Sequence, residues 1–177
     1  MAPRTDPAVD VPDLVDLAIR GDRDAFGQLF RRYYAAIFRV ARSRLPHALA
    51  EDATAETFAR AWKALPRYRR TGAPFVSWLY GIARHVVADA ASANRRAQSC
   101  DHIDTGSVDP WPQSDDGLRL RDALVALPEQ QRDVIELKFL VGLTNDEVAA
   151  ALGTTPGAVN TKQWRALRAL ARHLGRR

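Results

Sequence analysis

Cysteines, paired metal ligands and long apolar runs are scarce in this 177-residue sequence. Cys100 is the only cysteine, so the chain can form neither an internal disulfide nor a cysteine-based zinc site. Four histidines stand far apart and show no metal-ligand spacing: His47, His85, His102 and His173. No apolar run approaches the roughly 18 residues that span a bilayer, and residues 1–10 lack a signal-peptide pattern. We therefore expect a cytoplasmic protein without a metal or other cofactor.

The common catalytic motifs are also missing. The sequence contains no GxSxG nucleophile turn, no glycine-rich loop that could cradle phosphates and no HExxH zinc helix. Scattered Asp, His and Ser residues do not form a catalytic set, and we expect that the chain is not an enzyme.

Strand patterns and internal repeats are absent, whereas helical periodicity is widespread. Apolar residues recur at spacings of three to four over residues 13–20, 22–45, 49–65 and 74–95, and the breaks fall at Gly21, Pro46, Pro66 and the turn 71–74. The stripe along residues 26–40 is typical of a helix face that packs into a core. The sequence predicts an all-α fold.

Charge divides the chain into three parts. The net charge is +5 overall, with +6 in residues 1–96, −5 in residues 97–117 and +4 in residues 118–177. The acidic middle part has Gly, Pro, Ser and Asp without apolar periodicity, which is typical of a linker. We expect two helical domains, residues 1–96 and 118–177, joined by a flexible acidic linker at 97–117. The basic balance of both domains favours nucleic acid as a partner.

Residues 143–159 have the signature of two helices joined by a tight turn. Thr144 and Glu147 can form a capping box, and Gly153 suits the left-handed position that ends a helix. Thr155 can cap the next helix, with Pro156 at its first position. This arrangement matches a helix-turn-helix, whose second helix enters the DNA major groove.

The predicted second helix is basic throughout. Residues 156–177 hold six Lys or Arg and no acid. Such a helix face can simply be solvated, but cations beside polar groups also suit phosphates and base edges. The candidate DNA-contacting residues are Thr155, Asn160, Thr161, Lys162, Trp164, Arg165 and Arg168.

Two segments of the N-terminal part stand out. Residues 51–62 set acids and an arginine beside apolar anchors on one helix. Residues 67–80 mix arginines with aromatics around a turn, a combination that suits single-stranded nucleic acid. The competing interpretation is that Phe75, Trp78 and Tyr80 are ordinary core aromatics.

The order of these pieces, with Leu127-Pro128-Glu129-Gln130-Gln131-Arg132 before the helix-turn-helix, resembles the extracytoplasmic-function sigma factors of bacterial RNA polymerase, in the sigma-70 family. The resemblance covers about residues 15–174. It implies sigma region 2 in residues 1–96, sigma region 4 in residues 118–177, and a promoter-specificity factor that directs transcription initiation. It also implies binding to the polymerase core, at the beta prime clamp helices and the beta flap, and to promoter DNA, without membrane insertion.

The resemblance assigns residue roles by position. The helix with Asp52, Glu56, Thr57, Arg60 and Trp62 corresponds to the segment that docks on the polymerase core. The residues that correspond to contacts with the melted minus-10 element are Arg69, Arg70, Phe75, Trp78, Arg84, His85, Arg95 and Arg96. Of these, Trp78 is expected to support the wall of the site. The basic C-terminal helix would bind the minus-35 duplex. Family members are often held by an anti-sigma factor, so such a partner is an expectation here too.

Some positions depart from the family pattern. His85 stands where Asn is frequent, and Trp164 stands where His or another aromatic is found. Asn160 stands where Arg or Lys is common, and Lys162 stands where Arg is common. The promoter sequence therefore cannot be copied from a relative. Asn160 and Arg165 are the expected base readers, because Asn can pair with adenine and Arg with guanine, and Lys162 and Arg168 are expected on phosphates.

One alternative is a stand-alone helix-turn-helix regulator. It would need the C-terminal helices but would give no role to residues 51–62 and 75–84. Co-purification with polymerase core would separate the two functions.

Overall fold

The computed structural model describes residues 10–100 and 115–175. Every regular element in these two segments is helical, which confirms the predicted all-α class. In chain order the elements are α1 (Val11–Ile19), α2 (Arg23–Arg42), α3 (His47–Ala64), η1 (Leu65–Arg67), α4 (Phe75–Cys100), α5 (Asp115–Ala126), α6 (Glu129–Ile135), η2 (Glu136–Val141), α7 (Asn145–Leu152) and α8 (Pro156–Leu174). None of the described helices is long and apolar enough to span a membrane.

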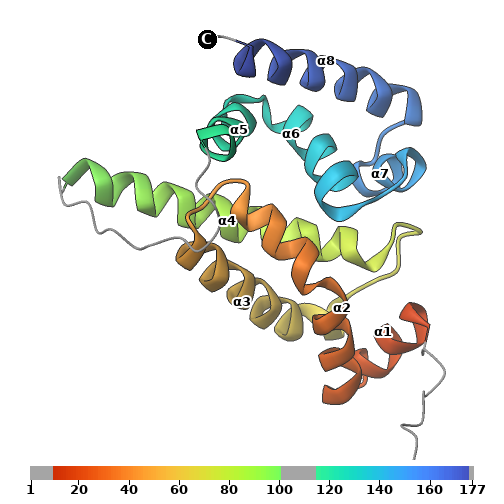
Figure 1. Cartoon of the computed structure of the whole chain (residues 1–177). Helices are drawn as coiled ribbons and strands as arrows, with labels where there is room; N and C mark the ends of the chain where they lie inside the picture. The colour runs from red at the N-terminus through yellow and green to blue at the C-terminus, as the bar shows by residue number, and fades with distance from the viewer. Residues whose placement is uncertain (1–9, 101–114, 176–177) are drawn as a thin grey trace, which may run out of the picture.

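Helices α1 to α4 form the N-terminal domain, the lower half of Figure 1. Asp22 caps α2 by accepting from the backbone N–H groups of Asp24 and Ala25, as expected for an acidic N-cap. The predicted apolar stripe of α2 lies inward, with Leu29, Ile37 and Val40 fully buried. Leu29 and Ile37 stabilise the domain by apolar burial in a cluster with residues of α3 and α4, whereas Val40 belongs to a second cluster.

Helices α5 to α8 form the C-terminal domain, the upper half of Figure 1. The helix-turn-helix has the predicted caps. Thr144 accepts from the N–H of Glu147 while the Glu147 carboxylate accepts from the N–H of Thr144, which completes the capping box. Gly153 ends α7 at φ 61°, and Thr155 starts α8 by accepting from the N–H of Ala158. Local sequence therefore determines both ends of the turn.

A π-helical segment, η2, continues α6 without a break. At its end, the N–H groups of Gly142 and Leu143 both donate to the carbonyl oxygen of Leu137, at 3.1 and 3.0 Å. Gly142 has φ 93°, a conformation that glycine adopts without the steric cost of a Cβ atom. Segments of this type are rare and occur frequently at functional sites.

Both ends of the expected linker are helical. α4 continues to Cys100, four residues past the expected domain end at 96, and α5 begins at Asp115. Residues 97–100 contain neither Gly nor Pro, so nothing in the backbone stops α4 there. Acidic residues at 115 and 116 favour a helix N-terminus through its dipole. The rest of the expected linker, residues 101–114, lies outside the described residues.

Candidate nucleic-acid interface

The outer face of α8 carries four of the predicted minus-35 residues. Thr161, Trp164, Arg165 and Arg168 follow one another at helical spacing, and all four are exposed. Trp164 is 60% exposed, unusually high for so large an apolar side chain. The Arg168 guanidinium lies 5.2 Å from the centre of its ring, a cation–π contact that joins the two side chains into one surface. This face offers cations, hydroxyls and an aromatic ring to a ligand.

The other three predicted minus-35 residues have different surroundings. The Thr155 hydroxyl caps α8. The exposed Asn160 accepts a 2.5 Å hydrogen bond from the side-chain amide of Asn145. Lys162 is half-buried and lines a cleft between the two domains. Thr155 is thus a helix cap as well as a candidate contact, and Lys162 does not share the outer face.

The first part of the predicted minus-10 segment, residues 69–78, begins with exposed arginines and continues into the core. Arg69 and Arg70 are exposed, and Arg70 forms an ion pair of 2.7 Å with Asp16. Phe75, only 5% exposed, has ring contacts with Tyr68 and Trp78. A base cannot stack on a ring that is already covered, so Phe75 is a core aromatic in this structure. The prediction of direct DNA contact is corrected for this residue, while half-buried Trp78 keeps a supporting position.

Further along α4, three predicted DNA residues are exposed. The His85 Nδ1 lies 2.7 Å from the carbonyl oxygen of Gly81 one turn earlier. That contact requires a proton on Nδ1, so in the neutral ring Nε2 is the acceptor. Arg95 donates to the Ser92 hydroxyl at 3.1 Å, and Arg96 is exposed nearby. These side chains extend a basic surface along the second half of α4.

The predicted polymerase-binding residues occupy two faces of α3. Asp52, Glu56 and Arg60 are exposed, and Glu56 and Arg60 form an ion pair of 2.6 Å one turn apart. Thr57 is fully buried, and its hydroxyl donates to the carbonyl oxygen of Ala53 at 2.7 Å. Thr57 therefore cannot touch a partner, which corrects the prediction for this residue. Trp62 is half-buried against Phe26, with 4.9 Å between ring centres.

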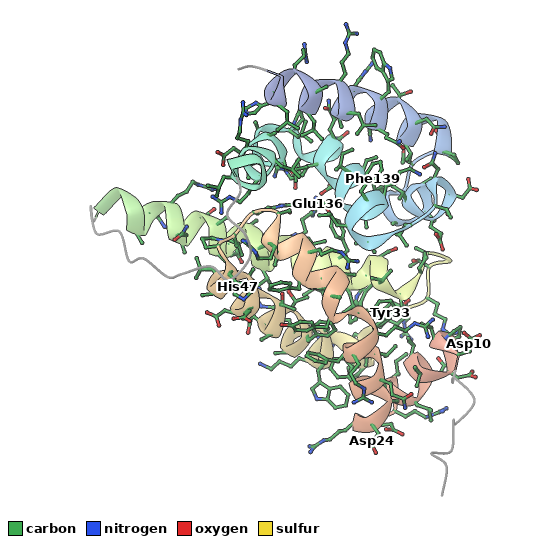
Figure 2. The ribbon with its side chains drawn as sticks, viewed as in Figure 1. Asp10, Asp24, Tyr33, His47, Glu136 and Phe139 are labelled. Carbon is green, nitrogen blue, oxygen red and sulfur yellow. The ribbon has the colours of Figure 1, made fainter. Side chains whose placement is uncertain are left out.

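A buried charge joins the two domains. Glu136 has no exposed surface, and it lies where the upper and lower halves of the molecule meet (Figure 2). Arg44 of the N-terminal domain donates to both of its carboxylate oxygens, at 2.8 and 2.6 Å. The hydroxyls of Tyr80 and Ser43 lie 2.9 and 3.2 Å from Glu136, and each shares its single proton between Glu136 and a second acceptor. Side chains from α4 and from the segment after α2 thus surround one carboxylate of the C-terminal domain.

Asp133 and Glu129, one and two turns before Glu136, extend this contact. The buried Asp133 accepts from the Tyr80 hydroxyl at 2.7 Å and from Arg84 at 3.1 Å. Glu129 pairs with the same Arg84 nitrogen at 2.8 Å. Arg84 was predicted to contact DNA, but in this conformation acids of the C-terminal domain hold it.

Ionisation at this interface follows from burial and pairing. Burial, followed by the nearby charges of Glu136 and Asp133, raises the pKa of Tyr80 well above its usual range, so the hydroxyl stays a donor. Burial lowers the pKa of Arg44, but the hydrogen bond and charge of Glu136 outweigh it and leave the pKa raised. Arg44 and Glu136 therefore form a charged pair between the domains.

Apolar side chains complete the interface. Val40 and Val76 of the N-terminal domain share one buried cluster with Leu137, Val148 and Val159 of the C-terminal domain. Arg39 also donates to the carbonyl oxygen of Leu140, at 2.8 and 3.0 Å. The two domains are thus packed together by a core of their own.

Sequence reasoning missed this interface. Asp133 and Glu136 flank Val134 and Ile135, and an acid inside an apolar run is a signal that it has a buried partner. The identity of the partner has no local signal, because Arg44 and Tyr80 lie 92 and 56 residues away.

Family models match both domains. Residues 29–97 match sigma-70 region 2, and residues 117–170 match sigma-70 region 4. The two matches occur in the order that the sequence resemblance implied.

Curated relatives agree with these matches. The sequence is 37% identical to the ECF RNA polymerase sigma factor SigD of Mycobacterium tuberculosis, over 86% of this chain and 78% of SigD. It is 34% identical to ShbA of Streptomyces griseus, over 95% of this chain and 98% of ShbA. It is 36% identical to BldN of Streptomyces coelicolor over 92% of this chain, which spans 65% of the length of BldN.

Solved structures share the fold. CnrH in complex with the cytosolic domain of CnrY superposes with a TM-score of 0.72 at 30% identity, over 94% of this chain and 98% of CnrH. RpoE of Bartonella quintana, in complex with the anti-sigma factor NepR, has a TM-score of 0.61 at 24% identity over 85% of this chain and 97% of RpoE. With both sigma regions matched in order and relatives above 30% identity along most of their length, the chain belongs to the extracytoplasmic-function sigma factors of the sigma-70 family.

Proposed function

We propose that this sigma factor holds a promoter at two separate elements, with α8 in the major groove of the minus-35 duplex. The observation that supports this proposal is the exposed outer face of α8, where Arg165 and Arg168 lie beside Thr161. The helix that precedes α8 in the helix-turn-helix has both of its caps. Arg165 reads a base, since a guanidinium matches the two acceptors of guanine, while Arg168 is placed to bind a phosphate. Trp164 packs under Arg168 and limits the positions that the guanidinium can take.

The minus-10 strand lies along the loop before α4 and the outer side of α4. Arg69 and Arg70 neutralise phosphates at the start of this path, and Arg95 and Arg96 do so at its far end. The cluster of Tyr68, Phe75 and Trp78 forms the rigid wall beneath. His85 contacts the DNA with Nε2, because Nδ1 is bound to Gly81.

The exposed acidic face of α3 docks on the beta prime clamp helices. Asp52, Glu56 and Arg60 supply charges that fix orientation, and Trp62 supplies an apolar anchor at the end of the helix. Region 4 docks on the beta flap. Residues 1–96 act as the region 2 domain and 118–177 as the region 4 domain, joined by the acidic linker.

Promoter binding requires the two domains to separate. Elements named for positions 35 and 10 are about 25 base pairs apart, roughly 85 Å along a duplex at 3.4 Å per pair. In the packed form the two domains share one cleft and one buried cluster, so their DNA-binding surfaces cannot reach elements that far apart. Separation frees Arg84 from Glu129 and Asp133 for the DNA backbone.

An anti-sigma factor is a further partner. CnrH and RpoE, which share this fold, were each solved with a protein partner, and the partner of RpoE is named an anti-sigma factor. A partner that binds both domains in the packed form would prevent them from reaching the two promoter elements at once.

In vitro transcription with purified polymerase core and a genomic DNA library tests this function, with start sites mapped by sequencing. We expect starts that share two upstream elements at a fixed separation. Two results would contradict binding at two elements. One is a set of start sites that share only one upstream element, and the other is the absence of any start site that depends on this chain.

A further inference from the structure

Asn160 is part of a chain of side-chain hydrogen bonds that runs through three elements of the C-terminal domain. The ammonium of Lys138, on η2, donates to the side-chain oxygen of Asn145, the first residue of α7. The Asn145 amide nitrogen donates to the side-chain oxygen of Asn160 on α8, at 2.5 Å. The order is therefore Lys138, Asn145, Asn160.

The direction of this chain follows from the chemistry of its first member. An ammonium group has three donors and no acceptor, so the Asn145 group that faces Lys138 must be the carbonyl oxygen. The Asn145 NH2 group then faces α8, and Asn160 must turn its own oxygen toward it. Lys138 thus determines the orientation of the side-chain amides of both Asn145 and Asn160.

This arrangement determines what Asn160 presents to a ligand. Its oxygen already accepts from Asn145, so its NH2 group, with two donors, is the part left to contact the DNA. A free asparagine side chain suits adenine, which offers one acceptor and one donor on its major-groove edge. Guanine offers two acceptors, N7 and O6, and these match a donor-only group better.

We propose that Asn145 is a specificity-determining residue of the minus-35 site, which makes Asn160 a hydrogen-bond donor and shifts its preference from adenine to guanine. This inference rests on the proposed role of α8 in minus-35 recognition. Asn145 acts through Asn160, as a positioning residue that need not touch the DNA. Thr144, not Asn145, caps α7, so the helix-turn-helix does not depend on the Asn145 side chain for its cap.

The test is transcription by the full-length chain with polymerase core from a promoter library randomised at the minus-35 element, read by sequencing the transcripts. The Asn160→Ala variant first identifies the base position that Asn160 reads. At that position the unmodified chain should prefer guanine on the contacted strand. In the Asn145→Ala variant, the ratio of transcripts with guanine to transcripts with adenine at that position should fall about tenfold. A change of this size corresponds to the discrimination that one good base contact provides.

The Asn145→Asp variant should reverse the group that Asn160 presents to the DNA. A carboxylate keeps the contact with Lys138 but has only acceptors, so Asn160 must turn its NH2 group inward and its oxygen toward the DNA. The preferred bases then become those with a donor, cytosine through N4 or adenine through N6. Asp146→Ala, at the exposed neighbouring position, is the matched control and should keep the guanine preference.

The outcomes separate this inference from the function on which it rests. If Asn160→Ala changes the base profile while both Asn145 variants keep that of the unmodified chain, the positioning role is wrong and the minus-35 role of Asn160 stands. If Asn160→Ala changes nothing, the minus-35 assignment of Asn160 fails and the inference fails with it. Thermal melting of each variant distinguishes lost specificity from lost folding, because only the former leaves the melting temperature unchanged.

Discussion

We expect recognition of the minus-35 element to depend most on Arg165. It is exposed on the outer face of α8 with Thr161 and Arg168. We predict that Arg165→Ala lowers transcription from a mapped promoter roughly tenfold and relaxes base preference at one upstream position, because a bidentate contact to guanine is lost. Binding to polymerase core, measured by gel filtration, should not change.

Arg172→Ala is the matched control for Arg165, since it removes the same charge from the exposed last turn of α8. It should alter affinity by a salt-dependent amount without changing base preference. Equal relaxation of specificity in both variants would show that α8 contributes only charge.

Phe75 has a different role from the arginines before it. Because its ring is buried among Tyr68 and Trp78, we predict that Phe75→Ala lowers the free energy of unfolding by about 3–5 kcal/mol, seen in denaturant or thermal melts. Arg69→Ala should leave the melt unchanged and weaken binding to a single-stranded minus-10 oligonucleotide. A stable Phe75→Ala variant with weak strand binding would mean that the ring contacts a base after all.

Sequence alone could predict side-chain chemistry at these sites but not exposure. Thr57 and Phe75 have the residue types expected of contacts, yet neighbouring helices cover both. Helical spacing predicts which residues share a face, and it correctly predicted the buried stripe of α2. Which of two faces meets a neighbour depends on packing between elements, and a single helix carries no such information.

At the scale of elements, the ends of the two helices in the helix-turn-helix were predictable, whereas the end of α4 was not. The capping box at Thr144, the turn at Gly153 and the cap at Thr155 all formed as local chemistry requires. The π-helical segment η2 was not predictable, because it lies against α2, which is distant in the sequence, and no local sequence signal marks it.

The capping box gives an element-scale prediction. Thr144→Ala removes the acceptor for the N–H of Glu147 and should lower the stability of the C-terminal domain by about 1 kcal/mol in chemical denaturation. Thr144→Ser keeps the oxygen and should be close to the unmodified chain. Equal losses in the two variants would argue that the methyl group, and not the cap, stabilises α7.

At the scale of the whole molecule, Glu136 holds the two domains together. Breaking a buried ion pair by neutralising one partner costs about 3–5 kcal/mol, since it leaves the other charge buried. Here the partners lie on different domains, so separation rehydrates Arg44 without unfolding either domain. We predict that Glu136→Gln increases the radius of gyration in small-angle X-ray scattering while helix content by circular dichroism stays constant.

Arg60→Gln is the control for Glu136→Gln, because it removes one partner of an exposed pair within α3. It should leave the radius of gyration unchanged. A compact Glu136→Gln variant would mean that the shared apolar cluster alone keeps the domains together.

Two helical modules were predictable from charge and periodicity, but their packing was not. The contact depends on Arg44, Tyr80 and Glu136, which lie far apart in the sequence and meet only when both domains have folded. The same contact pairs Arg84 with Glu129 and Asp133. A side chain such as that of Arg84 can therefore have a charge that suits DNA and still be engaged by other residues in the packed form.

The most direct measurement of the two-element grip is transcription in vitro from a mapped promoter whose spacer is lengthened by five base pairs. Five pairs turn the minus-35 element by about half a helical turn relative to the minus-10 element. If region 2 and region 4 bind one promoter together on the polymerase, transcription should fall at least tenfold, and a ten-pair insertion should not restore it because it moves the two elements about 34 Å further apart. Unchanged transcription with the five-pair insertion would contradict the two-element grip.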